Sequence, residues 1–198
     1  MGIEYELKFR AEPGQQEALL KALALPTREI RMETTYYDTP AGELSRRHIT
    51  LRRRMENELS VCTVKVPAPG GARGEWECHC SRIEKAIDEL CKLGAPAELP
   101  HWVAGGLAPV CGAKFTRLAA DIVTPEFTAE LALDRGVLLG GGGEIPLCEV
   151  ELELKSGDRT AMDGYTRILA ARFGLISEKK SKFARAKALA EEGNHGGI

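Results

Sequence analysis

The chain has 198 residues, of which 43% are hydrophobic, 28% are charged and 6% are aromatic, and its formal net charge is −2. This length and composition suit one globular domain with a core of its own. The near-balance of 27 basic and 29 acidic residues argues against a nucleic-acid coat or a polybasic membrane anchor, because both need a net basic field.

The N-terminus gives no sign of secretion or membrane insertion. MGIEYELKF carries charge from its fourth residue, and no segment approaches the ~20 apolar residues of a membrane span. We therefore expect a cytoplasmic protein without nucleic-acid or membrane partners, while its oligomeric state stays open. In that compartment the six cysteines should be reduced thiols. Cys78-His79-Cys80 is the tightest group, but no CxxC pair accompanies it, so thiols are favoured over a zinc site.

Period-two alternation predicts eight strands, and apolar residues at three- and four-residue spacing predict helices between them. In chain order we expect a strand at 3–9, a helix at 13–24, strands at 30–38, 49–56, 59–66 and 73–80, a helix at 82–93, a short helix or loop at 96–108, strands at 111–124, 127–138 and 145–155, and helices at 158–173 and 182–192. This order predicts an α+β protein built on one antiparallel sheet. We expect a single domain over residues 1–198, with a core at 3–186 and a frayed C-terminus.

Local signals mark some of the boundaries between these elements. Ser81 is expected to cap the helix that follows it, and Ser156 or Asp158 is expected to cap the helix at 158–173. The glycine run 140–143 has no Lys-Ser or Lys-Thr after it, so it is not a P-loop. A hairpin connection between two strands explains it better.

Charged side chains occupy one face of almost every strand predicted here. Residues two apart share a face of a strand, so Glu4, Glu6 and Lys8 lie together, opposite Tyr5 and Leu7. The same arrangement recurs in further groups: Glu149, Glu151 and Glu153; Arg52 and Arg54; Thr63 and Lys65; Arg73, Glu75 and Glu77; and Glu130 and Asp134.

A sheet with one solvated face gives the same alternation, but it does not explain the clustering of like charges. Like charges opposite each other destabilise a sheet unless a cation lies among the carboxylates and an anion among the Arg and Lys side chains. If the sheet closes, the charged faces line a lumen of about eight strands, which is wide enough for one small ligand. We therefore predict a closed eight-stranded antiparallel β-barrel, a tunnel with a charged lumen and helices packed outside.

The two kinds of charge point to one class of ligand. Pairs of glutamates bind hard divalent ions such as Mg²⁺ or Mn²⁺ through oxygen. Arg binds phosphate with a bidentate fork, and Lys binds it as a compact charge. A metal-bound polyphosphate meets both demands, and phosphoryl transfer needs mainly alignment and charge stabilisation from the protein.

The motifs resemble those of the CYTH, or triphosphate tunnel metalloenzyme, superfamily. Residues 4–8 match its ExExK signature, and the resemblance covers residues 3–186. Further matches follow in family order: Thr35-Tyr36-Tyr37-Asp38-Thr39-Pro40, Leu51-Arg52-Arg53-Arg54, Thr63-Val64-Lys65, Arg73-Gly74-Glu75-Trp76-Glu77, Arg117, Glu130 to Gly136, Cys148 to Leu154, and Ser181-Lys182-Phe183-Ala184-Arg185. The order and the residues of these motifs are most similar to those of the bacterial inorganic triphosphatase branch. Some relatives there carry a C-terminal helical domain of the CHAD type, which we do not expect in this chain.

The resemblance implies a triphosphate laid along the tunnel with one or two Mg²⁺ or Mn²⁺ ions. The implied metal ligands are Glu4, Glu6, Glu151 and Glu153, with Glu149 as a weaker candidate. The implied phosphate ligands are Lys8, Arg52, Arg54, Lys65, Arg73, Arg117, Lys182 and Arg185. Supporting roles, either in the metal shell or in holding Arg and Lys rotamers, fall to Glu75, Glu77, Glu130 and Asp134.

The expected reaction is hydrolysis of inorganic triphosphate to diphosphate and phosphate, by attack of water on a terminal phosphorus. Bound ions would neutralise phosphate oxygens and activate the water. Lys8 and Lys182 are both candidates to accept its proton. The alternatives are a thiamine or nucleoside triphosphatase, a class IV adenylyl cyclase, and a non-catalytic polyphosphate-binding module. A pure binder has little use for two glutamate pairs.

Overall fold

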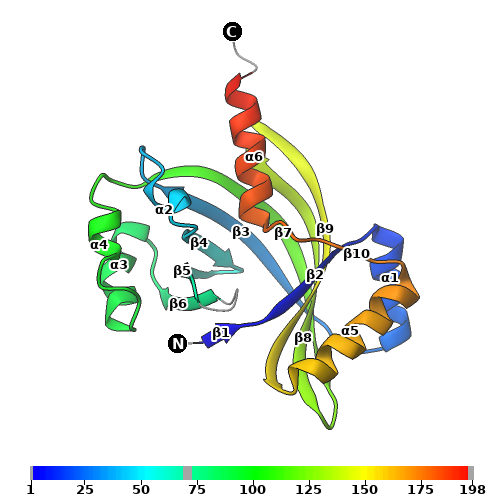
Figure 1. Cartoon of the computed structure of the whole chain (residues 1–198). Helices are drawn as coiled ribbons and strands as arrows, with labels where there is room; N and C mark the ends of the chain where they lie inside the picture. Colours follow the sequence, from blue (N-terminus) through cyan, green and yellow to red (C-terminus); the bar gives the residue numbers. More distant parts are fainter. Residues whose placement is uncertain (1, 69–72, 196–198) are drawn as a thin grey trace.

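The computed structural model describes residues 2–68 and 73–195, with side chains described for 5–68 and 73–193. It consists of one strongly curved antiparallel sheet with helices on both faces (Figure 1). The strands in the described residues are β1 (Gly2–Glu4), β2 (Glu6–Arg10), β3 (Arg28–Asp38), β4 (Thr50–Glu56), β5 (Leu59–Pro67), β6 (Arg73–His79), β7 (Ala108–Val123), β8 (Phe127–Gly140), β9 (Gly143–Gly157) and β10 (Ile176–Ser177). The predicted α+β class with an antiparallel sheet is therefore confirmed.

The helices of the described residues lie close to their predicted positions. They are α1 (Pro13–Leu23), α2 (Glu43–Arg46), α3 (Ile83–Lys92), α4 (Leu99–Trp102), α5 (Arg159–Phe173) and α6 (Lys182–His195). The short helix α2 was not predicted, and its first turn is fixed by the Asp38 carboxylate, which accepts hydrogen bonds from the backbone of Thr39, Leu44 and Ser45. Within the described part of the chain, no helix is both long enough and apolar enough to cross a membrane.

The strands follow the order β1-β6-β5-β4-β3-β7-β8-β9-β2-β10, and each neighbouring pair is antiparallel. β1 and β2 are successive parts of one N-terminal segment, separated by Tyr5. This segment pairs with β6 through β1 and with β9 through β2. Counting β1 and β2 as one strand, the structure contains the eight predicted strands plus the two-residue β10. In this order the two end strands, β1 and β10, are not neighbours, so the sheet is not closed on itself and the closed barrel stays a prediction.

Two apolar clusters cover the outer face of the sheet. One joins β4 and β5 to helices α2, α3 and α4, with Leu51, Val64 and Leu90 at its centre. The other joins β2, β7, β8 and β9 to helices α1 and α5, with Leu131 and Leu152 fully buried. These strand residues alternate with the charged ones, so burial of the apolar face directs the charged side chains to the inner, concave face.

Helix α6 does not follow the prediction that helices pack outside the sheet. Ala186 is buried together with Leu138 and Leu147, which lie on the same strand faces as the predicted site residues. The approach is close, because a Cβ atom on Gly140 would lie 2.3 Å from the carbonyl oxygen of Ala186. The helix thus occupies part of the concave side of the sheet, and its N-terminal end reaches the charged region (Figure 1).

Of the predicted helix caps and turns, the Asp158 cap and the glycine hairpin are confirmed, and the Ser81 cap is not. Asp158 caps α5, since its side chain accepts hydrogen bonds from the backbone of Thr160 and Ala161. The glycine run 140–143 is a hairpin, because Gly140 pairs with Gly143 around two central residues with φ of 58° and 79°. The Ser81 cap was wrong: the N-cap of α3 is Arg82, without a side-chain cap bond. Helix α6 continues to His195, and the final residues 196–198 lie outside the described part.

Candidate active site

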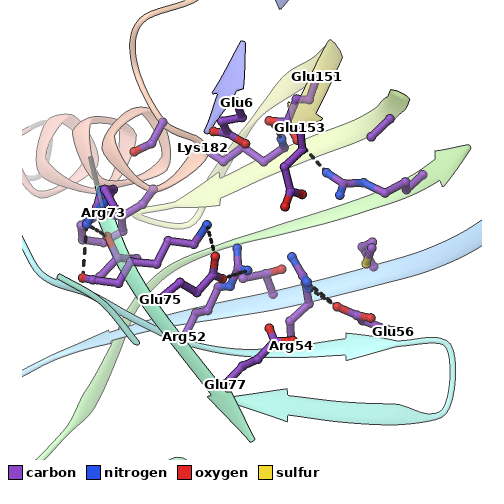
Figure 2. A pocket seen from close by; sticks show the side chains of 18 of the residues that line it. Glu6, Arg52, Arg54, Glu56, Arg73, Glu75, Glu77, Glu151, Glu153 and Lys182 are labelled. Atoms are coloured by element: carbon purple, nitrogen blue, oxygen red, sulfur yellow. Dashed lines mark hydrogen bonds and ion pairs between the residues drawn. The ribbon is translucent and has the colours of Figure 1, made fainter. Parts of the chain in front are cut away.

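A cavity of about 700 Å³ lies within the concave face, between strands of opposite charge (Figure 2). The pleat directs alternate side chains of strands β2 to β9 into it. The predicted site residues that line it are Glu6, Lys8, Arg52, Arg54, Lys65, Arg73, Glu75, Glu77, Arg117, Glu130, Glu151, Glu153 and Lys182. Segments far apart in the sequence therefore bring most of the predicted set around one space.

Three predicted residues with described side chains do not line the cavity. Asp134 and Glu149 are fully buried behind its wall, and Arg185 contacts Glu149 there. The side chain of Glu4, a predicted metal ligand, lies outside the described residues. Its backbone belongs to β1, opposite Arg73 of β6.

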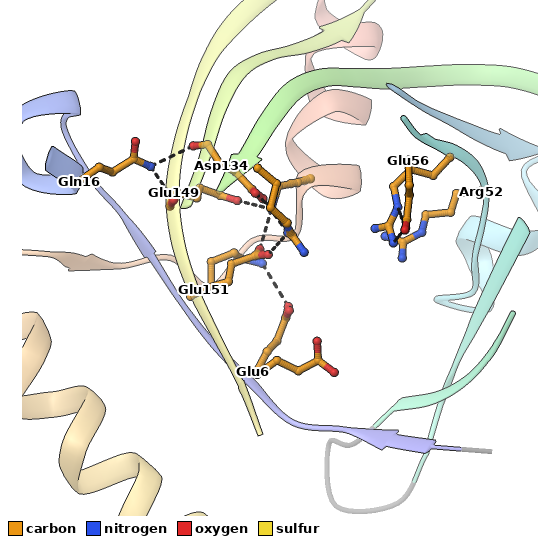
Figure 3. A network of polar contacts seen from close by, with 12 residues as sticks. Glu6, Gln16, Arg52, Glu56, Asp134, Glu149 and Glu151 are labelled. Atoms are coloured by element: carbon orange, nitrogen blue, oxygen red, sulfur yellow. Dashed lines mark hydrogen bonds and ion pairs between the residues drawn. The ribbon is translucent and has the colours of Figure 1, made fainter. Parts of the chain in front are cut away.

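Lys182, at the start of α6, lies among the carboxylates of Asp134, Glu149 and Glu151, which are labelled in Figure 3. Its Nζ atom is 2.6 Å from Glu151 Oε1, 2.7 Å from Glu149 Oε2 and 2.9 Å from Asp134 Oδ2. Burial opposes the charge of this ammonium, but the three carboxylates outweigh it and raise the pKa of Lys182. The ammonium donates a hydrogen bond to Glu151 Oε1 and forms ion pairs with Asp134 and Glu149.

Two arginines complete this cluster. Arg117 donates to both carboxylate oxygens of Asp134, at 2.7 and 2.8 Å, and to Glu151 Oε2 at 2.7 Å. Arg185 pairs with Glu149. Burial disfavours the charge of Glu151, yet Lys182 and Arg117 lower the pKa of its carboxyl well below the ordinary range. We call these six residues the acidic network: three carboxylates, Asp134, Glu149 and Glu151, balanced by three cations, Lys182, Arg117 and Arg185.

The opposite side of the cavity carries the basic wall, defined as Arg52, Arg54, Lys65 and Arg73. Arg52 and Lys65 share one carboxylate, with contacts of 3.6 Å to Glu75 Oε1 and 3.3 Å to Glu75 Oε2. Arg73 donates to the backbone oxygen of His48 at 2.9 Å. The contacts of Arg52 and Lys65 with Glu75 are longer than those of Lys182 with its carboxylates, and Glu75 is 19% exposed, so this carboxylate is accessible from the cavity.

Arg54 extends the basic wall along β4. Its guanidinium pairs with Glu56, a cavity residue that the sequence analysis did not identify. Burial lowers the pKa of Arg54, and the neighbouring charges of Arg52 and Arg117 lower it further. A buried guanidinium among other cations favours a bound anion. Glu56 was recognisable in principle, because it lies two residues after Arg54 on the same face of the strand.

The carboxylates fit a hard divalent ion in two different ways. Ligand oxygens of Asp134, Glu149 and Glu151 lie within 4.8 Å of one another, but the Lys182 ammonium already contacts all three. Glu6 and Glu153 lie opposite each other in the β2–β9 ladder and both line the cavity, with side chains 35% and 30% exposed. Opposed like charges favour a cation between them, and oxygen donors suit Mg²⁺ or Mn²⁺.

Aromatic residues at the α6 end of the cavity were also missed as site residues. Tyr36 lines the cavity and packs against Phe183, with ring centroids 5.1 Å apart. Phe115 lies beneath the charges, with Lys182 Nζ 5.5 Å from the centre of its ring. The inward direction of Tyr36 follows from strand alternation, but its contact with α6 needs the tertiary structure.

Comparison with known proteins gives one family. A model of the CYTH domain matches residues 2–186. The chain is 26% identical over 192 residues to the inorganic triphosphatase of Haemophilus influenzae, covering 94% of this chain and 54% of the relative. It is 31% identical over 154 residues to human thiamine-triphosphatase, covering 76% of this chain and 62% of the relative. The chain thus spans a little over half the length of these curated relatives.

Solved structures share the fold. A Hippeastrum protein described as an adenylyl cyclase with a dominant triphosphatase activity aligns with a TM-score of 0.63 and 20% identity, covering 98% of this chain and 96% of that one. The PH1819 protein of Pyrococcus horikoshii aligns with a TM-score of 0.60 and 20% identity, covering 92% and 97%. At these identities the likeness concerns the fold alone.

Proposed function

Because this chain belongs to the CYTH family, we propose that it is a metal-dependent triphosphatase that hydrolyses inorganic triphosphate to diphosphate and phosphate. The main support for the proposal is one cavity that has Glu6, Glu151 and Glu153 on one side and the basic wall on the other. A ligand that satisfies both sides must bring cations and anions together, as a metal-bound polyphosphate does. The inorganic triphosphatase of Haemophilus influenzae, at 26% identity, supports this choice of substrate.

We further propose that the sheet closes into a tunnel through its N-terminal segment. β1 pairs with β6 and β2 pairs with β9, so one continuous stretch of chain connects the two ends of the curved sheet. Closure would keep the phosphate chain away from bulk water, which strengthens every charge interaction with it.

In this proposal the basic wall holds the phosphate oxygens. Arg52 and Lys65 would exchange their shared contacts with Glu75 for phosphate, while Arg54 and Arg73 bind farther along the chain of phosphates. Glu75 and Glu56 then serve to keep these side chains extended into the cavity. Glu77 and Glu130 also line it and keep their predicted supporting role.

Glu6 and Glu153 would hold the metal, together with Glu4 as predicted from its motif. Glu151 also lines the cavity and would join them by giving up a contact with Lys182 or Arg117. A bound Mg²⁺ or Mn²⁺ would neutralise phosphate oxygens and lower the pKa of an attacking water. Glu149 is a poorer candidate than the sequence analysis expected, because it is fully buried between Lys182 and Arg185.

Water attacks the terminal phosphorus, a P–O bond forms, and the bond to the bridging oxygen breaks, leaving diphosphate with the electron pair. Of the two predicted proton acceptors, we favour Lys8, which would accept the proton of the attacking water as the neutral amine once a bound metal ion draws Glu6 away from it. Its side chain is 9% exposed, lines the cavity and lies 3.8 Å from Glu6 Oε1. Lys182 is unsuited, because its Nζ atom lies within 2.9 Å of the carboxylates of Asp134, Glu149 and Glu151, which stabilise the protonated ammonium. Lys182 and Arg117 instead hold the acidic side of the cavity in place.

A phosphate-release panel tests the proposed function. It compares triphosphate, thiamine triphosphate, ATP, diphosphate and long-chain polyphosphate, each with Mg²⁺, Mn²⁺ or EDTA. We expect turnover of triphosphate that EDTA abolishes. Equal turnover of ATP and triphosphate would contradict the substrate assignment, and no turnover of any compound would favour a binding module.

Thiamine-triphosphatase is the second candidate, for two reasons. The human enzyme of that name is 31% identical to this chain, and Trp76, Leu93 and Leu154 give the cavity an apolar border that suits an organic group. A preference for thiamine triphosphate in the same panel would select this function. The cytoplasmic location stays a prediction.

A further inference from the structure

Gln16 of helix α1 is a buried polar residue on the outer side of the sheet, behind the acidic network. It is only 3% exposed. Its Nε2 atom donates to the backbone oxygens of Asp134 at 3.1 Å and of Glu149 at 2.8 Å (Figure 3). Its Oε1 atom accepts a hydrogen bond from Arg135 Nε at 3.1 Å.

Every hydrogen-bonding group of this amide is used. Burying an amide costs free energy unless its donors and acceptor are paired, and an apolar residue would pack here without that cost. Leu19, one turn later on the same face of α1, is fully buried and apolar. The amide of Gln16 is therefore explained by its hydrogen bonds to these two backbone oxygens and not by the packing of helix α1.

Those two oxygens belong to the residues whose side chains surround Lys182. Asp134 of β8 and Glu149 of β9 are directly paired in the ladder, and their carboxylates contact Lys182 Nζ at 2.9 and 2.7 Å. The amide binds both strands at that pair, from the side opposite the cavity. Movement of either strand would change the position of a carboxylate relative to the ammonium.

We propose that Gln16 is a positioning residue for the reaction. It fixes the backbone of Asp134 and Glu149 from outside the sheet, so that the acidic network holds Lys182 and, through Glu151, keeps the metal-binding side of the cavity in register. The catalytic part of this inference rests on the proposed function, whereas the effect on Lys182 does not.

The test uses Gln16→Met, which keeps the side-chain length and removes the donors and the acceptor. We expect kcat for triphosphate with Mg²⁺ to fall on the order of tenfold, as for other residues that orient catalytic groups through a second contact. Gln16→Glu keeps the size and the partner of Arg135 but removes both donors, so it should show the same loss. It also serves if Gln16→Met fails to fold.

A second measurement reports on Lys182 without any turnover. The ammonium of Lys182 can be followed by ¹⁵N-resolved NMR in EDTA, with its signal assigned by its disappearance in Lys182→Met. Ammonium protons held by three carboxylates should exchange slowly in the wild type. In Gln16→Met we expect faster exchange or loss of that signal.

Two controls separate positioning from general stability. Gln15→Met changes the same residue type one position earlier, where the amide contacts the Glu12 nitrogen and the Gly174 oxygen instead. Leu19→Ala weakens the packing of α1 but leaves both contacts to Asp134 and Glu149. Both controls should keep kcat and the Lys182 signal, although Leu19→Ala lowers the melting temperature.

Three outcomes would overturn the inference. These are an unchanged Lys182 signal in both Gln16 variants, an unchanged kcat in both, or an equal fall of kcat in Leu19→Ala. If the wild type hydrolyses no triphosphate, the proposed function fails, and the NMR measurement still decides whether Gln16 positions Lys182.

Discussion

The two charged regions of the cavity are built differently. In the acidic network, Lys182 contacts its carboxylates at 2.6 to 2.9 Å, and these carboxylates are at most 9% exposed. In the basic wall, Arg52 and Lys65 contact Glu75 at 3.6 and 3.3 Å, and Glu75 is 19% exposed. The first region is closed and charge-balanced, whereas in the second the contacts with Glu75 are longer and this carboxylate is more exposed.

This difference assigns different tasks to residues of the same chemical type. A ligand can replace long, partly hydrated contacts at little cost, but it can enter the acidic network only by breaking buried ion pairs. We therefore expect substitutions in the acidic network to act mainly on stability, and substitutions in the basic wall to act mainly on substrate binding.

The largest effect is expected for Lys182→Met. The variant leaves three buried carboxylates with two arginines, and removing one partner of a buried ion pair costs about 3–5 kcal/mol. The free energy of unfolding, measured with urea in EDTA, should fall by this amount. Lys180→Met, an exposed lysine two residues earlier, is the matched control and should be silent. Equal stability of Lys182→Met and wild type would mean that the acidic network is not the scaffold described here.

Glu6→Gln should have the next largest effect, on turnover rather than on stability. A metal ion contributes several kcal/mol to transition-state stabilisation, so loss of a ligand should lower kcat/KM at least about 100-fold. Mn²⁺ affinity, measured by electron paramagnetic resonance, should fall in parallel. Glu29→Gln provides the control, because Glu29 is exposed and lies on the face of β3 that points away from the cavity. Full activity in Glu6→Gln would show that Glu6 is not a metal ligand.

Much of this contrast between regions could be predicted from single strands. Side-chain direction in a strand depends only on odd and even positions, so Arg52 and Arg54 were expected on one face and Glu151 and Glu153 on another. The structure directs all four into the same cavity. The order and type of the elements also follow from local patterns, because long alternating segments leave few alternatives.

The partners of these residues could not be predicted in the same way. Lys182 was expected to bind phosphate, but α6 packs inside the curved sheet and places its ammonium among Asp134, Glu149 and Glu151. That contact depends on glycines that let a helix approach the sheet, which no periodicity records. Gln16 was missed because one glutamine on a helix carries no signal until its neighbours are known.

A smaller effect should appear when the pH is lowered in EDTA. The pKa of Glu151 is lower in the folded protein than its ordinary value, so its contribution to stability is present above the unfolded-state pKa of about 4.3 and is lost as the pH falls through the folded-state pKa. The raised pKa of Lys182 acts in the opposite direction, and its contribution is lost only at strongly alkaline pH. The stability difference between wild type and Lys182→Met should therefore shrink below about pH 4. A constant difference between pH 7 and pH 3 would show that Glu151 does not depend on Lys182.

Arg52→Lys should have the smallest effect and gives the sharpest contrast. Lysine keeps the charge but loses the fork that grips two phosphate oxygens, and one lost hydrogen bond of about 1 kcal/mol corresponds to about a fivefold rise in the KM for triphosphate. Stability should hold better than in the acidic network, because lysine keeps the positive charge that faces Glu75 at 3.6 Å. Arg53→Lys is the matched control, since Arg53 points to the other face and donates to the Ser81 oxygen at 3.0 Å.

Arg117→Lys, in the acidic network, should lose stability instead, because Arg117 donates three hydrogen bonds of 2.7 to 2.8 Å to Asp134 and Glu151. If Arg52→Lys lowered stability while Arg117→Lys raised only KM, the assignment of the two regions would have to be reversed.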